Sequence, residues 1–545
     1  MSNNHVFQEF QAMLHSPEAS QRKTLMDILR KNRDTVYGKE FGFAGITNQK
    51  QFRQQVPLNR YIELKPYIDR AFKGEEGVLT REYVKAFFET SGTSSDPKYI
   101  PVTSSFIQDK TKAMNLYWKF VYDEFPDLKD KKIVANFSSG TSFGYTKNGV
   151  LIGSETDYWN LITQKIKKKN RWPIFYDLLK ITDYRVRHYC IAMLLLQDDI
   201  AAFMSPNPST LYILFQMIEE NFASLIRDIS SGTIDSGFRP GGDIYASFLK
   251  RVQPNPTRAE ELEEIVSSSG GRVPFHRIWP GLQLKICWQS TMLKPYTDRV
   301  SSRLKNVPDW DHLYQASEAI VSIPDRPNRR GGIANLIGNY FEFITPCDEA
   351  DQGSLGVCDL MHLEQGKSYE IVITNSTGLY RYRIGDVVRV LDFVQGVPRF
   401  EFVGRTGNVC SMTGEKITEN QVVEAFEATR NRLRVPPMDY CIFPIDDKLP
   451  HYGLILFTDH PARLPDLPVI AEKYEGYICQ MNGEYLAKRK SERLGAMEIF
   501  VTSQKHAAFF SKNKGQVTDQ TKPIRLSKEF NLNKRLDIIS SSTYL

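Results

Sequence analysis

The sequence lacks several features that would place it in a specialised class of protein. Its longest apolar run, Tyr189–Leu196, is far shorter than the roughly 20 residues that a membrane helix needs. Residues 1–5 have neither the basic nor the apolar region of a secretory signal. None of the seven cysteines forms a Cys-x-x-Cys pair. We therefore expect a cytoplasmic protein with reduced thiols and no membrane partner.

Net charge is also small, at +6 over 545 residues, and does not by itself favour nucleic-acid binding. The basic run at residues 165–171 (Lys165, Lys167, Lys168, Lys169 and Arg171) keeps a nucleic-acid binder open, but such runs are typical of a solvated helix face. Hydrophobic content of 41% and charged content of 25% are ordinary for a globular protein. The length suits two or more domains, and we expect no nucleic-acid partner.

The first two-thirds of the chain mix helical and strand patterns. The pattern predicts helical structure in the first forty residues, ending at Gly38. It also predicts a long amphipathic helix at Ser104–Phe125 and another helix at Leu211–Ile229. Strands are predicted at Tyr83–Phe88, Ile133–Phe137, Leu282–Trp288, Tyr340–Ile344, Tyr369–Thr374, Val387–Leu391 and Arg399–Val403. Strands mixed with long helices indicate an α/β fold with a large sheet system.

The pattern changes after Arg405. Helices are predicted at Asn420–Arg432 and Leu467–Met481, and strands at Tyr440–Phe443, Gly453–Phe457 and Glu498–Val501. These elements suffice for a separate α+β domain of normal size. We therefore predict a large domain at 1–404, a hinge at 405–408 and a smaller mobile domain at 409–545.

Thr90–Ser94, with the sequence Thr-Ser-Gly-Thr-Ser, concentrates small hydroxyl residues around one glycine just after a predicted strand. Phosphate oxygens need several donors at close range, and glycine lets backbone N–H groups approach them. The segment is not a Walker loop, because no Gly-x-x-x-x-Gly-Lys-Ser/Thr pattern occurs. A surface turn rich in Ser and Gly explains it equally well.

Tyr314–Glu318 ends in a carboxylate that follows a predicted buried strand. Mg²⁺ prefers oxygen ligands and usually bridges to phosphates, so Glu318 is a candidate Mg²⁺ ligand. The alternative is an acid at a helix N-terminus preceded by Ser317.

Two strand segments could contact a nucleoside. In Gly378–Val390, Asp386 follows a glycine and could accept hydrogen bonds from both ribose hydroxyls, while Arg381, Arg383 and Arg389 either face the site together or pair with acids elsewhere. Tyr340–Phe343 could stack an adenine on an aromatic ring, although a cross-strand core cluster is the usual explanation.

Gly404–Asn408 and Gly414–Asn420 lie at the predicted domain boundary. Gly404 and Gly407 give backbone freedom, and Arg405 offers a planar fork for ribose or phosphate oxygens. A hinge is one interpretation; an ordinary hairpin is the other.

Each segment alone is weak, but their order and spacing across more than 300 residues resemble the adenylate-forming superfamily of acyl-CoA synthetases and luciferases. The chain is most similar to the acyl-acid amido synthetases of the auxin-responsive promoter family, over nearly its whole length. Gly378–Val390, Tyr340–Phe343 and the Thr90 loop leading into Lys98–Pro101 carry this resemblance most specifically.

The resemblance implies a β-barrel-like part within the large domain, ATP and Mg²⁺ as cofactors, and a ligase that adenylates a small carboxylic acid and joins it to an amino acid. Aryl and indolyl acids are the expected class, and the protein is expected to be a monomer or weak dimer. The resemblance also implies roles for residues. The β- and γ-phosphates would be held by Thr90, Ser91, Gly92, Thr93 and Ser94, and the α-phosphate and Mg²⁺ by Ala316, Ser317 and Glu318. The adenine would be held by Tyr340, Phe341 and Glu342, and the ribose by Asp386. Near the hinge, Arg405 and Lys416 would hold the nucleotide, and Lys522 would hold the reacting carboxylate.

Two departures leave alternatives open. Ser95-Asp96 stands where relatives usually have another glycine, and a carboxylate there would repel a triphosphate unless it points away. Lys512 and Lys514 compete with Lys522 for the catalytic role. An acyl-CoA ligase and a catalytically silent homologue therefore remain rival interpretations.

Overall fold

The structure is a computed structural model that describes residues 3–90, 97–135, 143–156, 158–159, 176–181, 183–290, 293–345, 356–406, 409–413, 415, 417–447, 449–491, 493–510, 523–528 and 538–543. The chain divides into two compact units. The first consists of Met1–Pro206, Met217–Gln289 and Asn306–Phe402, and the second of Asn207–Gln216, Ser290–Lys305 and Val403–Leu545.

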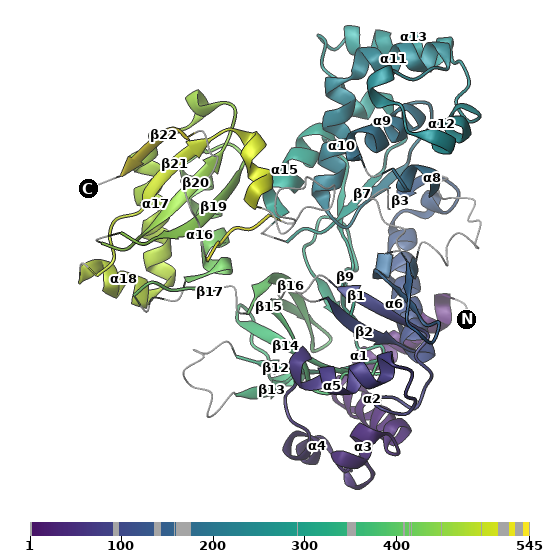
Figure 1. Cartoon of the computed structure of the whole chain (residues 1–545), viewed down its shortest axis with the longest axis vertical. Helices are drawn as coiled ribbons and strands as arrows, with labels where there is room; N and C mark the ends of the chain where they lie inside the picture. Colours follow the sequence, from purple (N-terminus) through teal and green to yellow (C-terminus); the bar gives the residue numbers. More distant parts are fainter. Residues whose placement is uncertain are drawn as a thin grey trace. The chain divides into compact units, whose positions relative to one another are not determined.

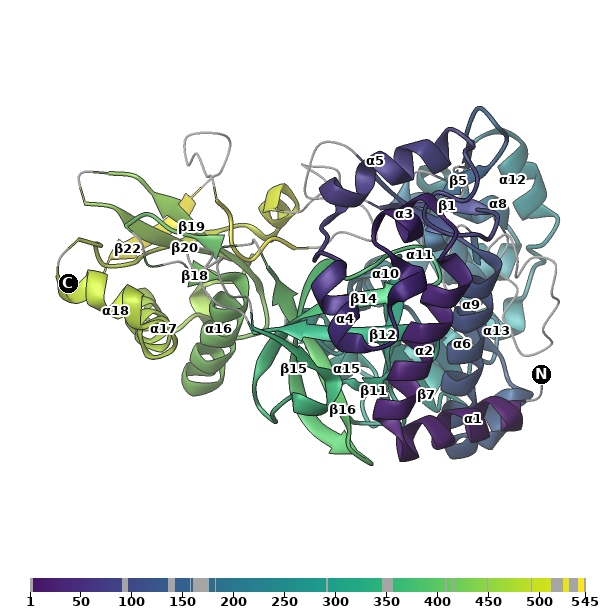
Figure 2. The same ribbon diagram turned by 90° about the horizontal axis from the view of Figure 1, so that it is seen from below.

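Short helices open the first unit (Figure 1). The predicted helical start is divided into α1 (Asn3–His15), α2 (Pro17–Asn32) and α3 (Val36–Glu40), followed by α4 (Gln49–Gln55) and α5 (Tyr61–Phe72). Pro17 begins α2, where its missing N–H costs nothing, and the Thr35 side chain caps α3 by accepting from Gly38 N. Helix α1 packs on α6 (Ser104–Glu124), and α2 packs on β12 (Asn339–Ile344) (Figure 2).

A small sheet carries the predicted phosphate loop and has the order β2-β1-β5-β4. Its strands are β1 (Ala86–Thr90), β2 (Lys98–Val102), β4 (Gly144–Tyr145) and β5 (Leu151–Gly153). Strand β1 pairs antiparallel with β2, with Thr90 opposite Lys98, and parallel with β5. Strand β1 thus begins three residues later than predicted and ends at Thr90, so the carboxyl ends of β1 and β5 share an edge of the sheet.

The first unit also contains a parallel sheet with the strand order β3-β6-β7-β8. Its strands are β3 (Ile133–Ala135), β6 (Ala202–Met204), β7 (Leu284–Cys287) and β8 (Asp309–Asp311). All of β7 is buried, as expected for a parallel strand covered on both faces. The helices of this part of the chain are α8 (Tyr176–Leu179), α9 (Tyr184–Leu195), α11 (Phe222–Ser231), α12 (Gly242–Leu249), α13 (Pro256–Ser267) and α14 (Phe275–Ile278). Helix α10 (Pro208–Glu220) lies between α9 and α11 in the sequence, but its residues up to Gln216 belong to the second unit.

The helix predicted at Leu211–Ile229 is in fact two helices, because α10 ends at Glu220 and α11 begins at Phe222. Asn221 between them donates its side-chain amide to Met217 O at 3.0 Å. A short amide side chain that bonds to the backbone in this way competes with helix continuation.

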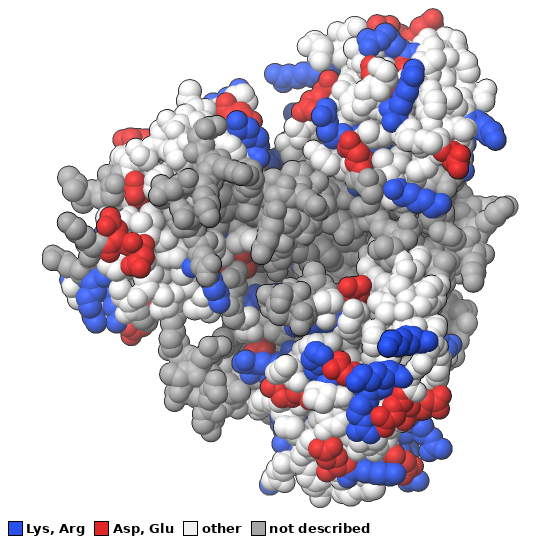
Figure 3. All heavy atoms as spheres, viewed as in Figure 1, with Lys and Arg blue, Asp and Glu red and all other residues white. Residues whose placement is uncertain are grey.

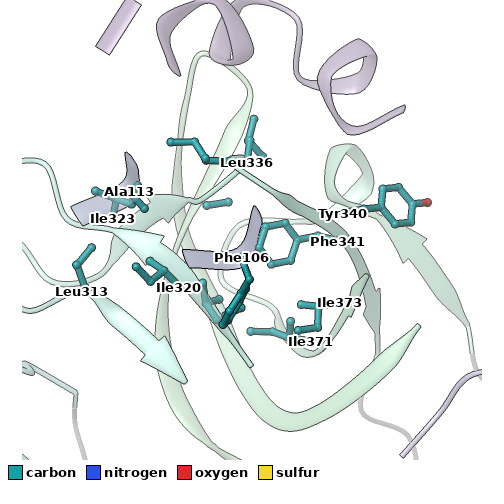
Figure 4. Close-up of a cluster of buried hydrophobic side chains, with 14 of the residues drawn as sticks. Phe106, Ala113, Leu313, Ile320, Ile323, Leu336, Tyr340, Phe341, Ile371 and Ile373 are labelled. Atoms are coloured by element: carbon teal, nitrogen blue, oxygen red, sulfur yellow. The ribbon is translucent and has the colours of Figure 1, made fainter. Parts of the chain in front are cut away.

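A long antiparallel sheet has the order β13-β12-β14-β15-β16-β11-β10-β9. Its other strands are β9 (Tyr314–Ala316), β10 (Ala319–Ile323), β11 (Gly332–Ala334), β13 (Val357–Asp359), β14 (Ser368–Asn375), β15 (Tyr382–Val394) and β16 (Val397–Arg405). Figure 4 shows part of the hydrophobic core on this sheet, where Phe106 of α6 lies among Ile320, Phe341 and Ile371. Burial of this cluster holds α6 against the strands that carry the predicted motifs.

The second unit is built on a sheet of order β19-β20-β21-β22. The strands are β19 (Asp439–Ile445), β20 (His451–Phe457), β21 (Glu498–Thr502) and β22 (Ile538–Thr543); the short pair β17 (Val409–Cys410) and β18 (Ile417–Thr418) precedes them. Helices α16 (Glu419–Leu433), α17 (Leu467–Met481) and α18 (Gly483–Lys490) accompany the sheet. A capping box of Thr418 and Gln421 begins α16, and Phe426 stacks on Tyr440 with ring centroids 3.6 Å apart.

Helix α15 (Lys294–Arg303) also belongs to the second unit, although it precedes most of that unit by more than 100 residues. Asp298 pairs with Arg430 of α16 at 2.8 Å, and Tyr296 donates to Asp439 Oδ2 at 3.3 Å. Gln504 Nε2 and Arg525 Nη2 bond to the same Asp439 carboxylate at 2.7 and 3.2 Å. Asp439 therefore joins segments that lie far apart in the sequence.

Two properties of the described residues concern membrane-spanning helices and surface charge. In the parts of the chain that the structure describes, no helix combines the length and apolar character that crossing a membrane would take. On the face seen in Figure 3, acidic and basic side chains are interspersed over the described surface rather than gathered by sign. The basic run at residues 165–171 lies outside the described residues.

Candidate active site

The turn between β9 and β10 carries the predicted Mg²⁺ ligand. Ala316 and Ala319 are paired, so Ser317 and Glu318 form the two-residue turn of a hairpin. The alternative of a helix N-terminus at Ser317 is therefore wrong. The Glu318 side chain is buried, and its backbone carbonyl accepts from Asn375 Nδ2 at 2.8 Å.

Tyr314 joins this hairpin to the predicted ribose-binding segment. Its hydroxyl donates to Asp386 Oδ2 at 2.7 Å, and its ring meets Phe402 edge-on at 5.7 Å. In the strand order, β9 and β15 are four steps apart, which is about 19 Å in a flat sheet at about 4.8 Å per step. The hydrogen bond is possible because the sheet curls, so curvature brings the two motifs together.

Asp386 is placed by a bulge in β15. Glu370 pairs with Val387 and Val372 pairs with Arg383, so Ile384–Asp386 lie opposite the single residue Ile371. Gly385 takes φ +82°, a backbone conformation that side chains disfavour. Bulges of this kind re-aim a side chain, and here the re-aimed side chain is the buried Asp386 carboxylate.

The three arginines of the Asp386 segment pair with acids instead of facing the site together. Arg383 makes two bonds to Glu370, at 2.8 and 2.6 Å, and Arg389 lies 3.6 Å from Glu401. Arg381 holds the buried Glu342 at 3.0 and 3.1 Å. The ion-pair interpretation therefore describes all three.

The predicted adenine segment is buried in the structure. Glu342 is bonded by Arg381 and, at 2.9 Å, by Arg53. Phe341 lies in the core, and Tyr340 stands at its margin with the hydroxyl directed away from the cluster (Figure 4). Burial raises the pKa of the Tyr340 hydroxyl, and the neighbouring Glu342 acts in the same direction. These contacts favour a core cluster over a surface on which adenine stacks.

The remaining predicted residues are divided between the units. Thr90 ends β1, and the Lys98 ammonium lies 5.6 Å from the centre of the Tyr61 ring. Arg405 ends β16, is exposed and belongs to the second unit. Ser91, Gly92, Thr93, Ser94, Lys416 and Lys522 lie outside the described residues, as do the rivals Lys512 and Lys514.

Sequence reasoning missed Lys110, a buried lysine at this site. Its ammonium bonds to Glu155 Oε1 at 2.5 Å and to Ala316 O at 2.9 Å. Burial lowers the pKa of the Lys110 ammonium, while Glu155 and Glu318 act in the opposite direction. The sequence does contain a signal for Lys110, because at helical spacing this lysine falls on the same face as Phe106, Ala113 and Tyr117, and that face of α6 is buried.

Tyr314, Ala316–Glu318, Asp386 and Lys110 therefore meet in the first unit, and Phe88 of β1 lies 5.7 Å from the Lys110 ammonium. Within the described residues, no group of three or more His, Cys, Asp or Glu side chains could hold a metal ion. Ser317 and Glu318 of the hairpin turn supply oxygen atoms, the donors that Mg²⁺ prefers.

Comparison with known proteins adds relatives of named function. The model of the GH3 family N-terminal domain matches residues 6–308, and that of the GH3 family central domain matches residues 333–405. A jasmonoyl–L-amino acid synthetase of Nicotiana attenuata is 26% identical over 531 residues, covering 92% of this chain and 89% of the relative. An indole-3-acetic acid-amido synthetase of Arabidopsis thaliana is 26% identical over 451 residues, covering 76% and 79%.

Solved structures show the same fold. The AtGH3.15 acyl acid amido synthetase in complex with 2,4-DB matches with a TM-score of 0.85 at 22% identity, over 100% of this chain and 97% of the other. A 2-hydroxyisobutyryl-CoA ligase in its postadenylation state matches with a TM-score of 0.55 at 12% identity, over 94% and 89%. The predicted α/β fold is thereby confirmed, and the matches to the family models confirm the family resemblance drawn from the motifs. Because the N-terminal-domain model spans more than half of the chain, the protein belongs to the GH3 family.

Proposed function

We propose that the protein is an ATP-dependent acyl acid amido synthetase. A carboxylate oxygen of the acid attacks the α-phosphorus of ATP, so that pyrophosphate leaves and an acyl-AMP forms. The amine of an amino acid then attacks the acyl carbon, loses a proton and displaces AMP. The protein supplies alignment and charge neutralisation and needs no covalent nucleophile.

The Tyr314–Asp386 hydrogen bond carries this proposal. It joins the hairpin that holds Ser317 and Glu318 to the carboxylate expected to bind ribose, so groups for two parts of one nucleotide lie together. The names of the relatives support the same reaction, because a jasmonoyl–L-amino acid synthetase and an indole-3-acetic acid-amido synthetase join an acid to an amino acid.

In this proposal each group keeps one task. Asp386 accepts hydrogen bonds from the ribose hydroxyls, and Thr90–Ser94 with Ser317 donate to phosphate oxygens. Glu318 would hold Mg²⁺, whose charge would offset that of the phosphates. Arg405 and Lys416 support the nucleotide, and Lys522 neutralises the reacting carboxylate.

The acid is proposed to be a small carboxylic acid of the aryl or indolyl class. An acyl-CoA ligase is the second candidate, because the fold also matches a 2-hydroxyisobutyryl-CoA ligase. The two candidates share adenylation and differ in the nucleophile that accepts the acyl group, which is an amine in one and a thiol in the other.

The test is pyrophosphate release from ATP and Mg²⁺ with a panel of acids that includes jasmonic acid, indole-3-acetic acid and 2,4-DB. Each acid is tested with a mixture of amino acids, with CoA, and with neither. Tyr314→Phe and Asp386→Asn are tested beside Glu364→Gln, a control at an exposed position of the same unit.

Release that rises with amino acids and yields an amide supports the proposal. Release that needs CoA identifies an acyl-CoA ligase, and no release with any acid, despite ATP binding, favours a silent homologue. EDTA should abolish release. Asp386→Asn should slow it by roughly 10²–10³, as removal of a preorganised polar contact does, and Glu364→Gln should not.

A further inference from the structure

Lys110 is a charged residue at a position where α6 otherwise presents apolar side chains to the core. Its side chain is 2% exposed, and it lies between the β1 strand and the β9–β10 hairpin. The ammonium has three N–H donors. Two are directed to Glu155 Oε1 and Ala316 O, and the Phe106 ring centre lies 4.9 Å from the nitrogen.

Glu155, the anionic partner, comes from the edge of the small sheet. It follows β5 by two residues, and β5 runs parallel to β1, which leads into the predicted phosphate loop. Trp159 Nε1 also donates to Glu155 Oε1, at 3.1 Å. A continuous chain of hydrogen bonds therefore runs from Trp159 through Glu155 and Lys110 to the carbonyl of Ala316.

The Ala316–Glu318 turn is thus held from both sides. Lys110 bonds to the carbonyl before the turn residues, and Asn375 bonds to the carbonyl of Glu318 itself. The Lys110 charge also acts on the Glu318 carboxylate through space. Lys110 therefore acts on the predicted Mg²⁺ ligand in two ways: it holds the backbone at Ala316, two residues before Glu318, and its charge attracts the Glu318 carboxylate.

A buried ion pair is a poor way to stabilise a core, because the desolvation of both ions offsets their attraction, and apolar residues of similar volume are often as stable. By this argument an apolar pair of similar volume in place of Lys110 and Glu155 would pack about as stably. The retained charge therefore indicates a task beyond packing.

We propose that Lys110 is a positioning residue for adenylation: its ammonium, held by Glu155, sets the Ala316–Glu318 turn so that the Glu318 carboxylate and Ser317 meet Mg²⁺ and the α-phosphate. This inference rests on the proposed function. Lys110 bonds to the turn that the proposal assigns to the α-phosphate and Mg²⁺, so its effect is expected in the first half-reaction.

The experiment compares Lys110→Met with the neutral double variant Lys110→Met/Glu155→Gln, which leaves no buried charge uncompensated. Acyl-AMP formation is measured in a single turnover over a range of Mg²⁺ concentrations. Amide formation from supplied acyl-AMP and the thermal midpoint are measured in parallel. Lys119→Met is the matched control, because Lys119 lies on the same helix and pairs with the exposed Asp123.

The double variant should melt close to the parent yet form acyl-AMP about 100-fold more slowly, as a misplacement of about 1 Å can cause. It should need more Mg²⁺ for half-maximal rate, and it should convert supplied acyl-AMP within about threefold of the parent. Lys119→Met should leave all of these readouts unchanged.

The inference would be overturned if the double variant formed acyl-AMP at the parental rate. It would also be overturned if the rates of acyl-AMP formation and of amide formation fell by the same factor. Failure of both variants to fold would also overturn it, because the charge would then be kept for the fold. A parent that makes no acyl-AMP with any acid would instead refute the proposed function, which separates the two failures.

Discussion

At the scale of single residues, buried charges in the first unit are satisfied by several partners each. Arg381 has φ +44° and directs its guanidinium to Glu342 and to the carbonyls of Arg53 and Val56, where α4 ends. A cation at the carbonyl end of a helix is favourable. The strained backbone of Arg381 is thus maintained by what its side chain binds.

Replacing Glu342 with Gln should destabilise the first unit by about 3–5 kcal/mol, because it leaves the buried Arg381 facing an uncharged amide, whereas the half-buried Arg53 keeps Asp359. Denaturant unfolding gives the free-energy difference. Asp27→Asn is the control, since Asp27 pairs with exposed Lys23 and Arg30 and should change stability by at most about 1 kcal/mol. Equal effects of the two variants would contradict this account.

His312 contributes an acid-dependent loss of stability to the first unit. Burial lowers the pKa of His312 from 6.5 to about 4. Between these two pKa values the imidazole is protonated in the unfolded chain and neutral in the folded chain. The free energy of unfolding therefore falls by roughly 3 kcal/mol as the pH drops from about 6.5 to about 4. The adjacent Asp311 acts in the opposite sense, because burial raises its pKa to about 7 and the folded state binds the proton more tightly.

The variant His312→Gln removes the loss of stability that His312 causes at low pH and keeps the opposite contribution of Asp311. Its thermal midpoint, relative to the parent, should therefore rise as pH is lowered from 7 to 4.5, whereas the exposed control His276→Gln should show no such trend. A relative midpoint that is independent of pH would show that His312 is not held neutral. Calorimetry at several pH values provides the measurement.

At the scale of elements, the hairpin of β15 and β16 contains two glycines with nearly the same φ. Gly385 has φ +82° in the bulge before Asp386, and Gly396 has φ +81° in the turn after Gln395. A Cβ at Gly396 would meet nothing nearer than 3.8 Å. These glycines therefore make a matched pair, alike in φ and different in what they position.

Gly385→Ala and Gly396→Ala should each cost roughly 1–2 kcal/mol of stability, because both force a side chain into the left-handed region. We expect Gly385→Ala in addition to raise the KM for ATP at least roughly 10-fold, since the bulge aims Asp386. Gly396→Ala should leave that KM near the parental value. Parallel KM changes in both variants would mean that the bulge has no special part in ATP binding.

Several elements could be predicted from sequence, and their physical basis explains which. Helix α17 has the predicted bounds Leu467–Met481, because a Pro near its start and a clear apolar period define it. The single helix predicted at Leu211–Ile229 was wrong, because its apolar period continues through Asn221, where the backbone does not.

The site was predictable in parts only. Asp386 and Glu318 could be selected as candidates, because carboxylates beside glycine or strand ends are chemically suggestive. The contact between Tyr314 and Asp386 could not be predicted from the sequence, because it depends on the curvature of the sheet across the strands that lie between them. Lys110 was visible as a charge on an apolar helix face, but its partners Glu155 and Ala316 are set by packing.

At the scale of the whole molecule, the break between the two units falls between Phe402 and Val403, within β16. We expect that Gly407→Pro, a few residues later, would impair one half-reaction more than the other, because proline restricts φ at the proposed hinge. Single-turnover adenylation and amide formation from supplied acyl-AMP, measured separately, test this. An enzyme unaltered in both steps would count against a hinge at this position.

Helix α15 has a consequence for how the chain is made. Arg299 lies 3.5 Å from Asp439, its partner 140 positions later in the sequence. A ribosome that adds about 5–20 residues per second needs roughly 7–28 s to cover that distance. During this interval Tyr296, Asp298 and Arg299 have left the ribosome before the strand and helix that receive them exist, so the newly made chain must keep α15 from docking wrongly until its last third is synthesised.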